Sequence, residues 1–293
     1  MPKYHLHHVE FYITNVCNLT CTNCRSFNNF KFSGHYKFNQ ADHQSWADIL
    51  DLDTIVILGG EPTLHPDLFK WMIGLRKAWP NSIGELVTNG TYLSRIVGLH
   101  EIAAKYNYEI KINMHAKDLR EMIAEQIFLA FGDCIILPNE DIYNQKVSNT
   151  IKLKTNLGVI IHCLNSEEFQ ISPVKNNKFE FYNSNPEIAH KNCIIANCHH
   201  MVDGKLYKCG FMATASEFLK QQHVLVPPLL AAYTPLIPST VNSAQVLKTF
   251  LNFIPQCSFC QEENSIIKIN ATLKNKKIFK IQSLIRPIKT QGL

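Results

Sequence analysis

Hydrophobic and polar positions in the first half of the chain follow two alternating patterns, one typical of strands and the other of helices. Short runs rich in β-branched and aromatic residues predict strands at residues 8–14, 53–58, 84–88, 109–114 and 158–163. The stretches between them predict helices at residues 44–50, 66–79, 92–106 and 118–131. An apolar stripe on the second helix consists of Leu68, Met72, Leu75 and Trp79. We expect this stripe to face a sheet.

The strand-then-helix rhythm is the signature of parallel βαβ units, so the predicted fold class is α/β. A sixth strand is predicted at residues 179–182, and the rhythm is lost near residue 185. Because a complete (β/α)8 barrel takes ~250 residues, six units forming a partial, TIM-like (β/α)6 barrel fit the count better. The loops after the strand C-termini would then line one mouth, where such folds place their chemistry.

A change of character after residue 185 predicts a second, smaller domain. A short β pattern with cysteines begins at Cys193, and Asp203-Gly204 predicts a tight hairpin because both residues tolerate positive φ. We therefore expect a barrel core at residues 1–188, a small cysteine-rich β-hairpin/helix domain at 189–265 and a basic C-terminal tail at 266–293.

The composition narrows the class of protein. Of 293 residues, 46% are hydrophobic and 18% are charged, as in a globular protein. The Met1 end has no continuous apolar segment and no apolar run reaches the ~18 residues that span a bilayer, so we expect no membrane partner. The ten cysteines then indicate a reducing, cytoplasmic compartment. Much of the net charge of +5 comes from residues 274–280, read as a solvated terminus without a role.

Three cysteines carry the first chemical signal. Cys17, Cys21 and Cys24 follow the first predicted strand with the spacing C-x3-C-x2-C. Three thiolates on one short loop can converge on a single metal centre, and three is one fewer than the usual complement of a cubane iron–sulfur cluster. A site with one ligand missing keeps an iron open for chemistry.

This spacing resembles the cluster loop of the radical S-adenosylmethionine (SAM) superfamily. The resemblance implies a [4Fe–4S] cluster whose vacant position is filled by the amino and carboxylate groups of SAM. The second predicted strand is followed by Gly59, Gly60, Glu61 and Pro62. A Gly-Gly-Glu-Pro motif in this family contacts the amino group of SAM, and the glycines would let the backbone approach a ligand closely. This segment is therefore a candidate cofactor-binding site.

Polar residues at the ends of the next two strands, Thr88, Asn89 and Asn113, are further candidates. Family members use polar groups at these positions to hold the ribose and carboxylate of SAM, although an Asn-Gly pair is also an ordinary turn. Asn23 departs from the family pattern, in which an aromatic residue often precedes the third cysteine and packs near the adenine. Residues 159–161 either pack the adenine or belong to the core.

A second cysteine group consists of Cys193, Cys198, Cys209, Cys257 and Cys260. It resembles the auxiliary-cluster extension called a twitch domain, the shortened form of the SPASM domain. Four thiolates would close a second [4Fe–4S] cluster and favour electron transfer over substrate binding. The resemblance favours Cys193, Cys209, Cys257 and Cys260, with Cys198 as the alternate because it falls opposite Cys209 in an ideal hairpin. A structural zinc site with four sulfurs is the competing interpretation.

The other cysteines and the histidines receive no metal-binding role. Cys134 and Cys163 stand alone in apolar surroundings and are expected to be small buried side chains. The histidines show no HExxH or similar pairing. Four of them are expected on the surface or in loops: His7, His8, His199 and His200.

These features together predict a radical SAM enzyme. The resemblance implies reductive cleavage of SAM to a 5′-deoxyadenosyl radical, which abstracts hydrogen from a substrate C–H bond for oxidation or cross-linking of a peptide or small molecule. A flavodoxin or ferredoxin is the expected electron donor. The segment before the first predicted strand is too short for a leader-binding domain, so we expect none, and this slightly favours a small molecule or a peptide presented by another protein. The alternatives are a zinc-binding, cysteine-rich nucleic-acid-binding protein and a catalytically inactive radical SAM scaffold; the pattern assigns no acid or base.

Overall fold

The core of the protein is a nine-stranded sheet, seen in a computed structural model that describes residues 3–138, 150–165, 168–170, 174–175, 180–241, 244–263, 266–268 and 271–274. Its strands are β1 (Tyr4–Tyr12), β3 (Leu50–Leu58), β4 (Ile83–Thr88), β5 (Tyr108–Asn113), β6 (Cys134–Leu137), β7 (Thr150–Thr155), β8 (Ile160–Leu164), β12 (His199–Val202) and β13 (Lys205–Tyr207). Their order is β13-β12-β1-β3-β4-β5-β8-β7-β6.

Six adjacent strands of this sheet, from β12 through β1 to β8, are parallel. The mixed α/β class with a large parallel sheet is confirmed, as are the five strands predicted in the first half. The prediction of a sixth barrel strand at residues 179–182 was wrong. A short strand β11 (Glu180–Phe181) does form there, but it pairs with β10 (Val174–Lys175) outside the main sheet. The sixth parallel position belongs to β12, and closure into a partial barrel stays a prediction.

One face of the parallel sheet is apolar and packs against the helices of the first half. These helices are α1 (Gln40–Ala47), α2 (Leu68–Ala78), α3 (Leu99–Lys105) and α4 (Arg120–Phe131), with short 3-10 turns η1 (Pro62–Leu64), η2 (Leu93–Arg95) and η3 (Lys117–Leu119). The apolar stripe predicted on α2 is buried throughout, in one core with Phe11 and Ile57 of the strands. Period-2 alternation therefore fixes which side chains of each strand face the opposite side.

That opposite face is polar. In register across the sheet, Glu10 lies beside Val56, Val56 beside Glu85, and Glu85 beside Glu109. Glu85 forms an ion pair with Lys111 at 2.5 Å, and the carboxylate of Glu109 lies 2.9 Å from the His162 ring. The polar face of the sheet thus carries acid–base pairs between neighbouring strands.

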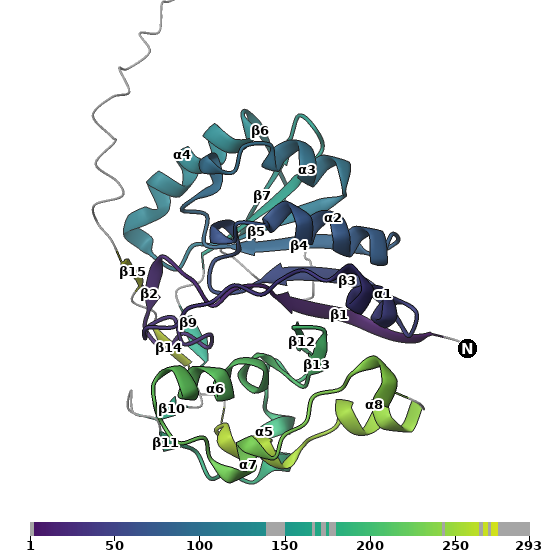
Figure 1. The fold of residues 1–293 in the computed structure, drawn as a ribbon. Helices are drawn as coiled ribbons and strands as arrows, with labels where there is room; N and C mark the ends of the chain where they lie inside the picture. The colour runs from purple at the N-terminus through teal and green to yellow at the C-terminus, as the bar shows by residue number, and fades with distance from the viewer. Residues whose placement is uncertain are drawn as a thin grey trace, which may run out of the picture.

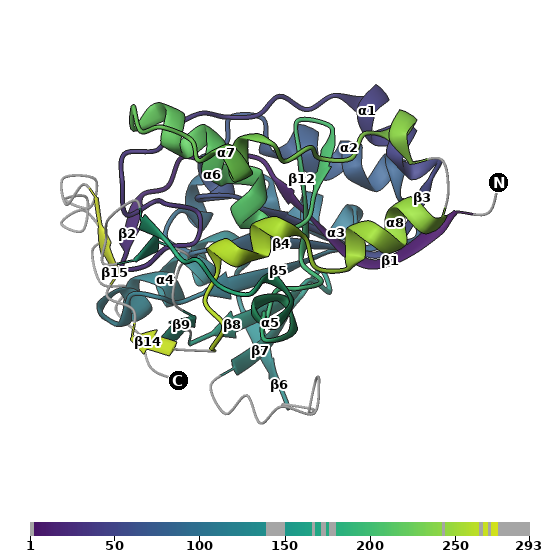
Figure 2. The same cartoon turned by 90° about the horizontal axis from the view of Figure 1, so that it is seen from below.

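The helices after residue 185 gather beside the end of the sheet formed by β1, β12 and β13 (Figures 1 and 2). These helices are α5 (Pro186–Lys191), α6 (Gly210–Gln221), α7 (Pro228–Ala231) and α8 (Ala244–Leu251), with 3-10 turns η4 (Pro238–Thr240) and η5 (Pro255–Phe259). The predicted hairpin is confirmed as β12–β13, with φ of 49° at Asp203 and 69° at Gly204. Because β12 pairs with β1, the hairpin of the predicted second domain belongs to the main sheet. The bounds of the two domains remain a prediction.

Two strands near the C-terminus pair with earlier parts of the chain. The strand β14 (Ile266–Lys268) pairs with β9 (Glu168–Gln170), and β15 (Ala271–Leu273) pairs with β2 (Leu19–Cys21). The region predicted as a tail therefore contains strands. In the described part of the chain, no helix combines the length and the apolar character needed to cross a membrane.

Replacing Gly84 by valine is expected to destabilise the sheet. A Cβ at Gly84 would lie 2.6 Å from the ring of Tyr108, which is buried on β5 and donates its hydroxyl to Met72 O at 2.9 Å. Overpacking of this kind costs about 1–3 kcal/mol of unfolding free energy, measurable by denaturant unfolding. The exposed neighbour Ile83→Val is the control, expected to change stability by less than ~0.5 kcal/mol. Equal losses in the two variants would contradict the proposed clash.

Candidate functional site

A cavity of about 350 Å³ lies at the carboxyl ends of the parallel strands. Its wall includes every residue of the predicted cofactor and cluster sites in the first half except Pro62: Cys17, Cys21, Cys24, Gly59, Gly60, Glu61, Thr88, Asn89 and Asn113. Pro62 is buried at the start of η1. The structure therefore brings residues from four strand ends onto one surface.

The loop carrying the three cysteines is tied to the segment that follows β3. Gly60 N donates to Thr14 O at 2.7 Å, and Glu61 N donates to Val16 O at 2.8 Å. A Cβ at Gly60 would lie 2.4 Å from Val16 O, so only glycine permits this approach. The two segments are therefore held together by backbone contacts.

Asn18 connects the same loop to the end of β4. Its side-chain amide donates to Thr91 Oγ1 at 2.7 Å, and its Oδ1 accepts from Asn89 Nδ2 at 2.9 Å. Asn89 Oδ1 in turn accepts from Thr91 N and Thr91 Oγ1 at 3.0 and 2.6 Å. Asn89, predicted to contact SAM, thus also positions the cysteine loop.

The thiols of Cys17 and Cys21 are poorly solvated, and both lie near Cys24. Burial, followed by the charge of Glu61, raises the pKa of Cys17 to about 12. Burial also raises the pKa of Cys21, with the neighbouring Cys24 and Cys17 as further causes. Thiolates at these positions would be stabilised by a cation that all three share, because a metal displaces the thiol protons.

Glu61 is fully buried and accepts hydrogen bonds from the chain itself. Its Oε1 accepts from Thr63 N at 3.0 Å, Thr63 Oγ1 at 2.6 Å and Thr88 Oγ1 at 2.6 Å. Its Oε2 accepts from Asn89 N at 2.7 Å. Burial raises the pKa of Glu61, and these donors oppose that rise. Thr88 therefore holds Glu61 in place.

Four cysteines of the second group surround a small cavity of about 30 Å³: Cys193, Cys209, Cys257 and Cys260. Burial, followed by the charges of the other three, raises the pKa of Cys260. Cys198 is not part of this wall, and after burial the largest cause of its pKa of about 12 is Glu10. Cys198 thus lies outside this small cavity, although the charges of Cys193 and Cys209 also raise its pKa.

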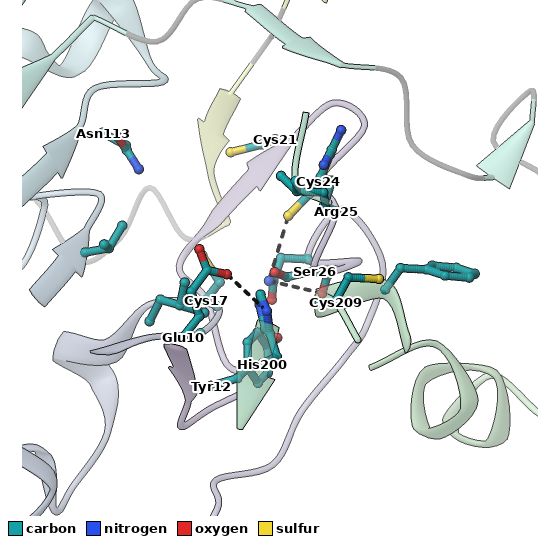
Figure 3. Close-up of a pocket in the computed structure, with 18 of the residues that line it drawn as sticks. Glu10, Tyr12, Cys17, Cys21, Cys24, Arg25, Ser26, Asn113, His200 and Cys209 are labelled. Carbon is teal, nitrogen blue, oxygen red and sulfur yellow. Dashed lines mark hydrogen bonds and ion pairs between the residues drawn. The ribbon is translucent and has the colours of Figure 1, made fainter. Parts of the chain in front are cut away.

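The two cysteine groups face one chamber, because Cys193, Cys209 and Cys260 also line the main cavity. The half-buried loop residue Cys24 is followed by Phe27, which stacks on Phe218 of α6 with ring centroids 4.2 Å apart. This aromatic contact joins the first loop to the second half of the chain. Figure 3 shows Cys17, Cys21, Cys24 and Cys209 around the cavity.

Sequence reasoning missed several residues of the cavity wall: Glu10, Tyr12, Arg25, His200 and Phe211. The carboxylate of Glu10 lies 3.0 Å from Nδ1 of His200 (Figure 3). Burial raises the pKa of Glu10 to about 7 and lowers that of His200 to about 4. The available signal was the alternation on the first strand, where polar positions 8, 10 and 12 face away from buried Val9 and Phe11.

The prediction that His199 and His200 lie on the surface or in loops was wrong. Both are buried on β12, because this strand is flanked by β1 and β13 and covered on both faces. His8 is half-buried, and His7 is exposed as predicted. Cys163 is buried as predicted, whereas Cys134 is only half-buried.

The strand β15 lies against the first cysteine loop through its pairing with β2. The next residue, Lys274, donates its backbone N–H to Asn18 O at 2.9 Å. The positive charge of Lys274 opposes the burial that raises the pKa of Cys17 and Cys21. Lys274 belongs to the stretch to which the sequence assigned no role, and the structure places it beside the loop.

No protein-family model and no curated protein matches the chain. Among solved structures it is similar to BtrN in complex with AdoMet and 2-DOIA, at 14% identity over 90% of this chain and 98% of that chain, with a TM-score of 0.45. It is similar to anSMEcpe with bound AdoMet, at 16% identity over 43% and 40% of the two chains, with a TM-score of 0.34. It is similar to Streptococcus suis SuiB bound to S-adenosylmethionine, at 20% identity over 43% of this chain and 31% of that chain, with a TM-score of 0.34. The matched part spans less than half the length of the last two proteins.

Replacing Glu61 by glutamine is expected to destabilise the cavity wall. The amide would place an N–H opposite a donor that now faces Oε1 or Oε2, leaving buried polar groups unsatisfied. We expect a loss of about 1–3 kcal/mol in unfolding free energy, measured by denaturant unfolding. Glu121→Gln on the exposed face of α4 is the matched control and should unfold like the wild type. Wild-type stability in Glu61→Gln would mean that these hydrogen bonds contribute nothing.

Proposed function

We propose that this protein is a radical SAM enzyme with a second, auxiliary iron–sulfur cluster. The observation that supports the proposal best is the shared cavity, with three cysteines of one loop and the Gly59-Gly60-Glu61 segment on one side and three of the four grouped cysteines on the other. Separate structural metal sites would not need to border one chamber. An enzyme that passes electrons between a cofactor, a substrate and a cluster would.

The first donor set fits an open [4Fe–4S] cluster. Cys17, Cys21 and Cys24 supply three thiols on the cavity wall and leave one iron without a protein ligand. Such a cluster, once reduced and with SAM bound, would supply the electron that cleaves SAM to methionine and a 5′-deoxyadenosyl radical, which would abstract hydrogen from a substrate C–H bond. Glu61 Oε2 accepts one hydrogen bond, from Asn89 N, and can accept another from the amino group of SAM.

Other wall residues would orient SAM at the ends of β4 and β5. Asn113 lines the cavity at the end of β5, and Asn89 does so at the end of β4. Thr88 acts through Glu61, since its hydroxyl donates to that carboxylate. Residues 159–161 do not line the cavity, and Val159 and Ile161 pack in the core, which favours a core role over an adenine contact.

The second donor set fits a closed cluster with four thiolates, from Cys193, Cys209, Cys257 and Cys260. A closed cluster has no open iron, so it would exchange electrons and leave substrate binding to the cavity. The net reaction would then be an oxidation or oxidative cross-link of a small molecule or peptide. A flavodoxin or ferredoxin would supply electrons from outside.

Iron content tests the proposal directly. Anaerobically purified protein should contain about eight irons and eight sulfides per chain, with the visible absorption of iron–sulfur clusters. A Cys17/Cys21/Cys24 triple alanine variant should retain about four, because only the first cluster is lost. About four irons in both proteins would show that the first loop binds no cluster. Zinc without iron would favour the structural-zinc alternative.

The assignment of the second donor set has its own test in two single variants. Cys209→Ala should lower the iron content by about four per chain, because it removes one of the four converging thiols. Cys198→Ala should keep the wild-type iron content, because Cys198 lies outside this group. The reverse result, with iron lost from Cys198→Ala alone, would replace the proposed ligand set with the alternate one.

A further inference from the structure

The strands β1 and β12 bring a set of metal-binding side chains together on one face of the sheet. In the parallel pairing, Glu10 lies beside His200 and Val9 beside His199. Cys198 directly precedes β12, so extending this register by one residue would put it beside His8. Side chains two residues apart on a strand share a face, so His8 and Glu10 of β1 point to the same side of the sheet.

Three of these side chains converge on a single point. A ring nitrogen of His8, a carboxylate oxygen of Glu10 and Sγ of Cys198 all lie within 4.8 Å of one another. All three residues are half-buried. A nitrogen, an oxygen and a sulfur donor with this spacing can bind one ion after small side-chain rotations.

A fourth side chain, His200, contacts Glu10 and the backbone of Cys198. Its Nδ1 lies 3.0 Å from Glu10 Oε2 and 3.4 Å from Cys198 O, so a proton on Nδ1 faces two acceptors. Gly210 packs closely against the ring, since a Cβ at Gly210 would lie 2.7 Å from its Nε2. Carboxylates that ligate metals are usually oriented by hydrogen bonds of this kind.

Cys198 is also the one cysteine of the second group without a place in the four-thiol cavity. Its closest charged neighbour in electrostatic effect is Glu10, on the other strand of the pair. The donor atom of the fifth cysteine therefore groups with those of a histidine and a carboxylate, outside the four-thiol cavity.

We propose that His8, Glu10 and Cys198 bind one Zn²⁺ ion, separate from both cysteine clusters. Imidazole and thiolate donors disfavour Mg²⁺ and Ca²⁺, which prefer oxygen ligands, whereas mixed nitrogen, oxygen and sulfur donors suit zinc. Three protein ligands leave a fourth position for water or for an oxygen group of a substrate. Because Glu10 lines the main cavity, the ion lies at the wall of the chamber in which, under the proposed function, the substrate binds.

Zinc and iron measured on the same samples test the site. Full-length protein is reconstituted anaerobically with iron and sulfide, which occupies the cluster cysteines, and is then dialysed against Zn²⁺. Wild type should retain about one zinc per chain, with X-ray absorption showing sulfur at ~2.3 Å and nitrogen or oxygen at ~2.0–2.2 Å. His8→Gln and Cys198→Ser should lose this zinc at unchanged iron content. His200→Gln should bind it about 10–100-fold more weakly.

Two matched variants serve as controls. His7→Gln changes the residue that precedes His8 on β1. The His7 side chain faces the other side of the sheet, where its Nδ1 lies 2.8 Å from Asp53 Oδ2. Cys134→Ser changes a half-buried cysteine outside both groups. Both should bind zinc like the wild type, which excludes a general loss from histidine or cysteine replacement.

The outcomes separate this proposal from the proposed function. Zinc absent from wild type that holds about eight irons would overturn the zinc site and leave the enzyme proposal standing. Zinc retained in both His8→Gln and Cys198→Ser would also overturn the zinc site. If these variants also contained no iron, the retained zinc would be assigned to the four-thiol group. Zinc lost from these two variants alone would support the site whatever the iron content.

Discussion

The close approach of two backbone segments is the constraint on which the candidate site depends. The loop with Cys17 runs directly against Gly59 and Gly60, and a Cβ at Gly60 would lie 2.4 Å from Val16 O. Two backbone hydrogen bonds, from Gly60 N and Glu61 N, fix this approach. The sequence suggested that these glycines admit a ligand. The structure shows that the glycines are needed for the fold itself. A side chain there would clash with the cysteine loop, which could then not lie beside the end of β3.

The buried carboxylate of Glu61 extends this constraint across the strand ends. A buried charge is costly unless several donors satisfy it, and the four hydrogen bonds to Glu61 come from two segments, η1 and the end of β4. The carboxylate thereby couples the position of β4 to that of the glycine segment. Asn89 then carries the coupling back to the cysteine loop through Asn18. Hydrogen bonds within the chain thus connect all three segments of the wall.

Local pattern predicted the parts of this arrangement that depend on local rules. The five strands, the stripe on α2 and the turn at Asp203-Gly204 follow from periodicity and from φ preferences, and all three are confirmed. Pairings between distant segments carry no local signal. The pairing of β12 with β1 buried His199 and His200, and residues 180–181 pair with β10 outside the main sheet.

The same limit applied to the site. Motif spacing identified the cysteines and the glycine segment, whereas Glu10 and His200 emerged only when the register of two strands 190 residues apart was known. Lys274 is a further case, since its place beside the cysteine loop follows from the pairing of β15 with β2. Side chains that act through a neighbour on another strand cannot be read from spacing along one chain.

The polar face of the sheet carries acid–base side-chain pairs that the stability of the fold alone does not explain. On the helix-covered face the parallel strands present Phe11, Ile57 and Ile110, all fully buried. On the other face the same strands present three acid–base pairs, at Glu85–Lys111, Glu109–His162 and Glu10–His200. Replacing partly buried pairs of this kind by apolar residues is often neutral or stabilising, so folding alone does not require them. Of the three pairs, only Glu10–His200 has both members on the wall of the cavity between the two cysteine groups, where, under the proposed function, a substrate would bind.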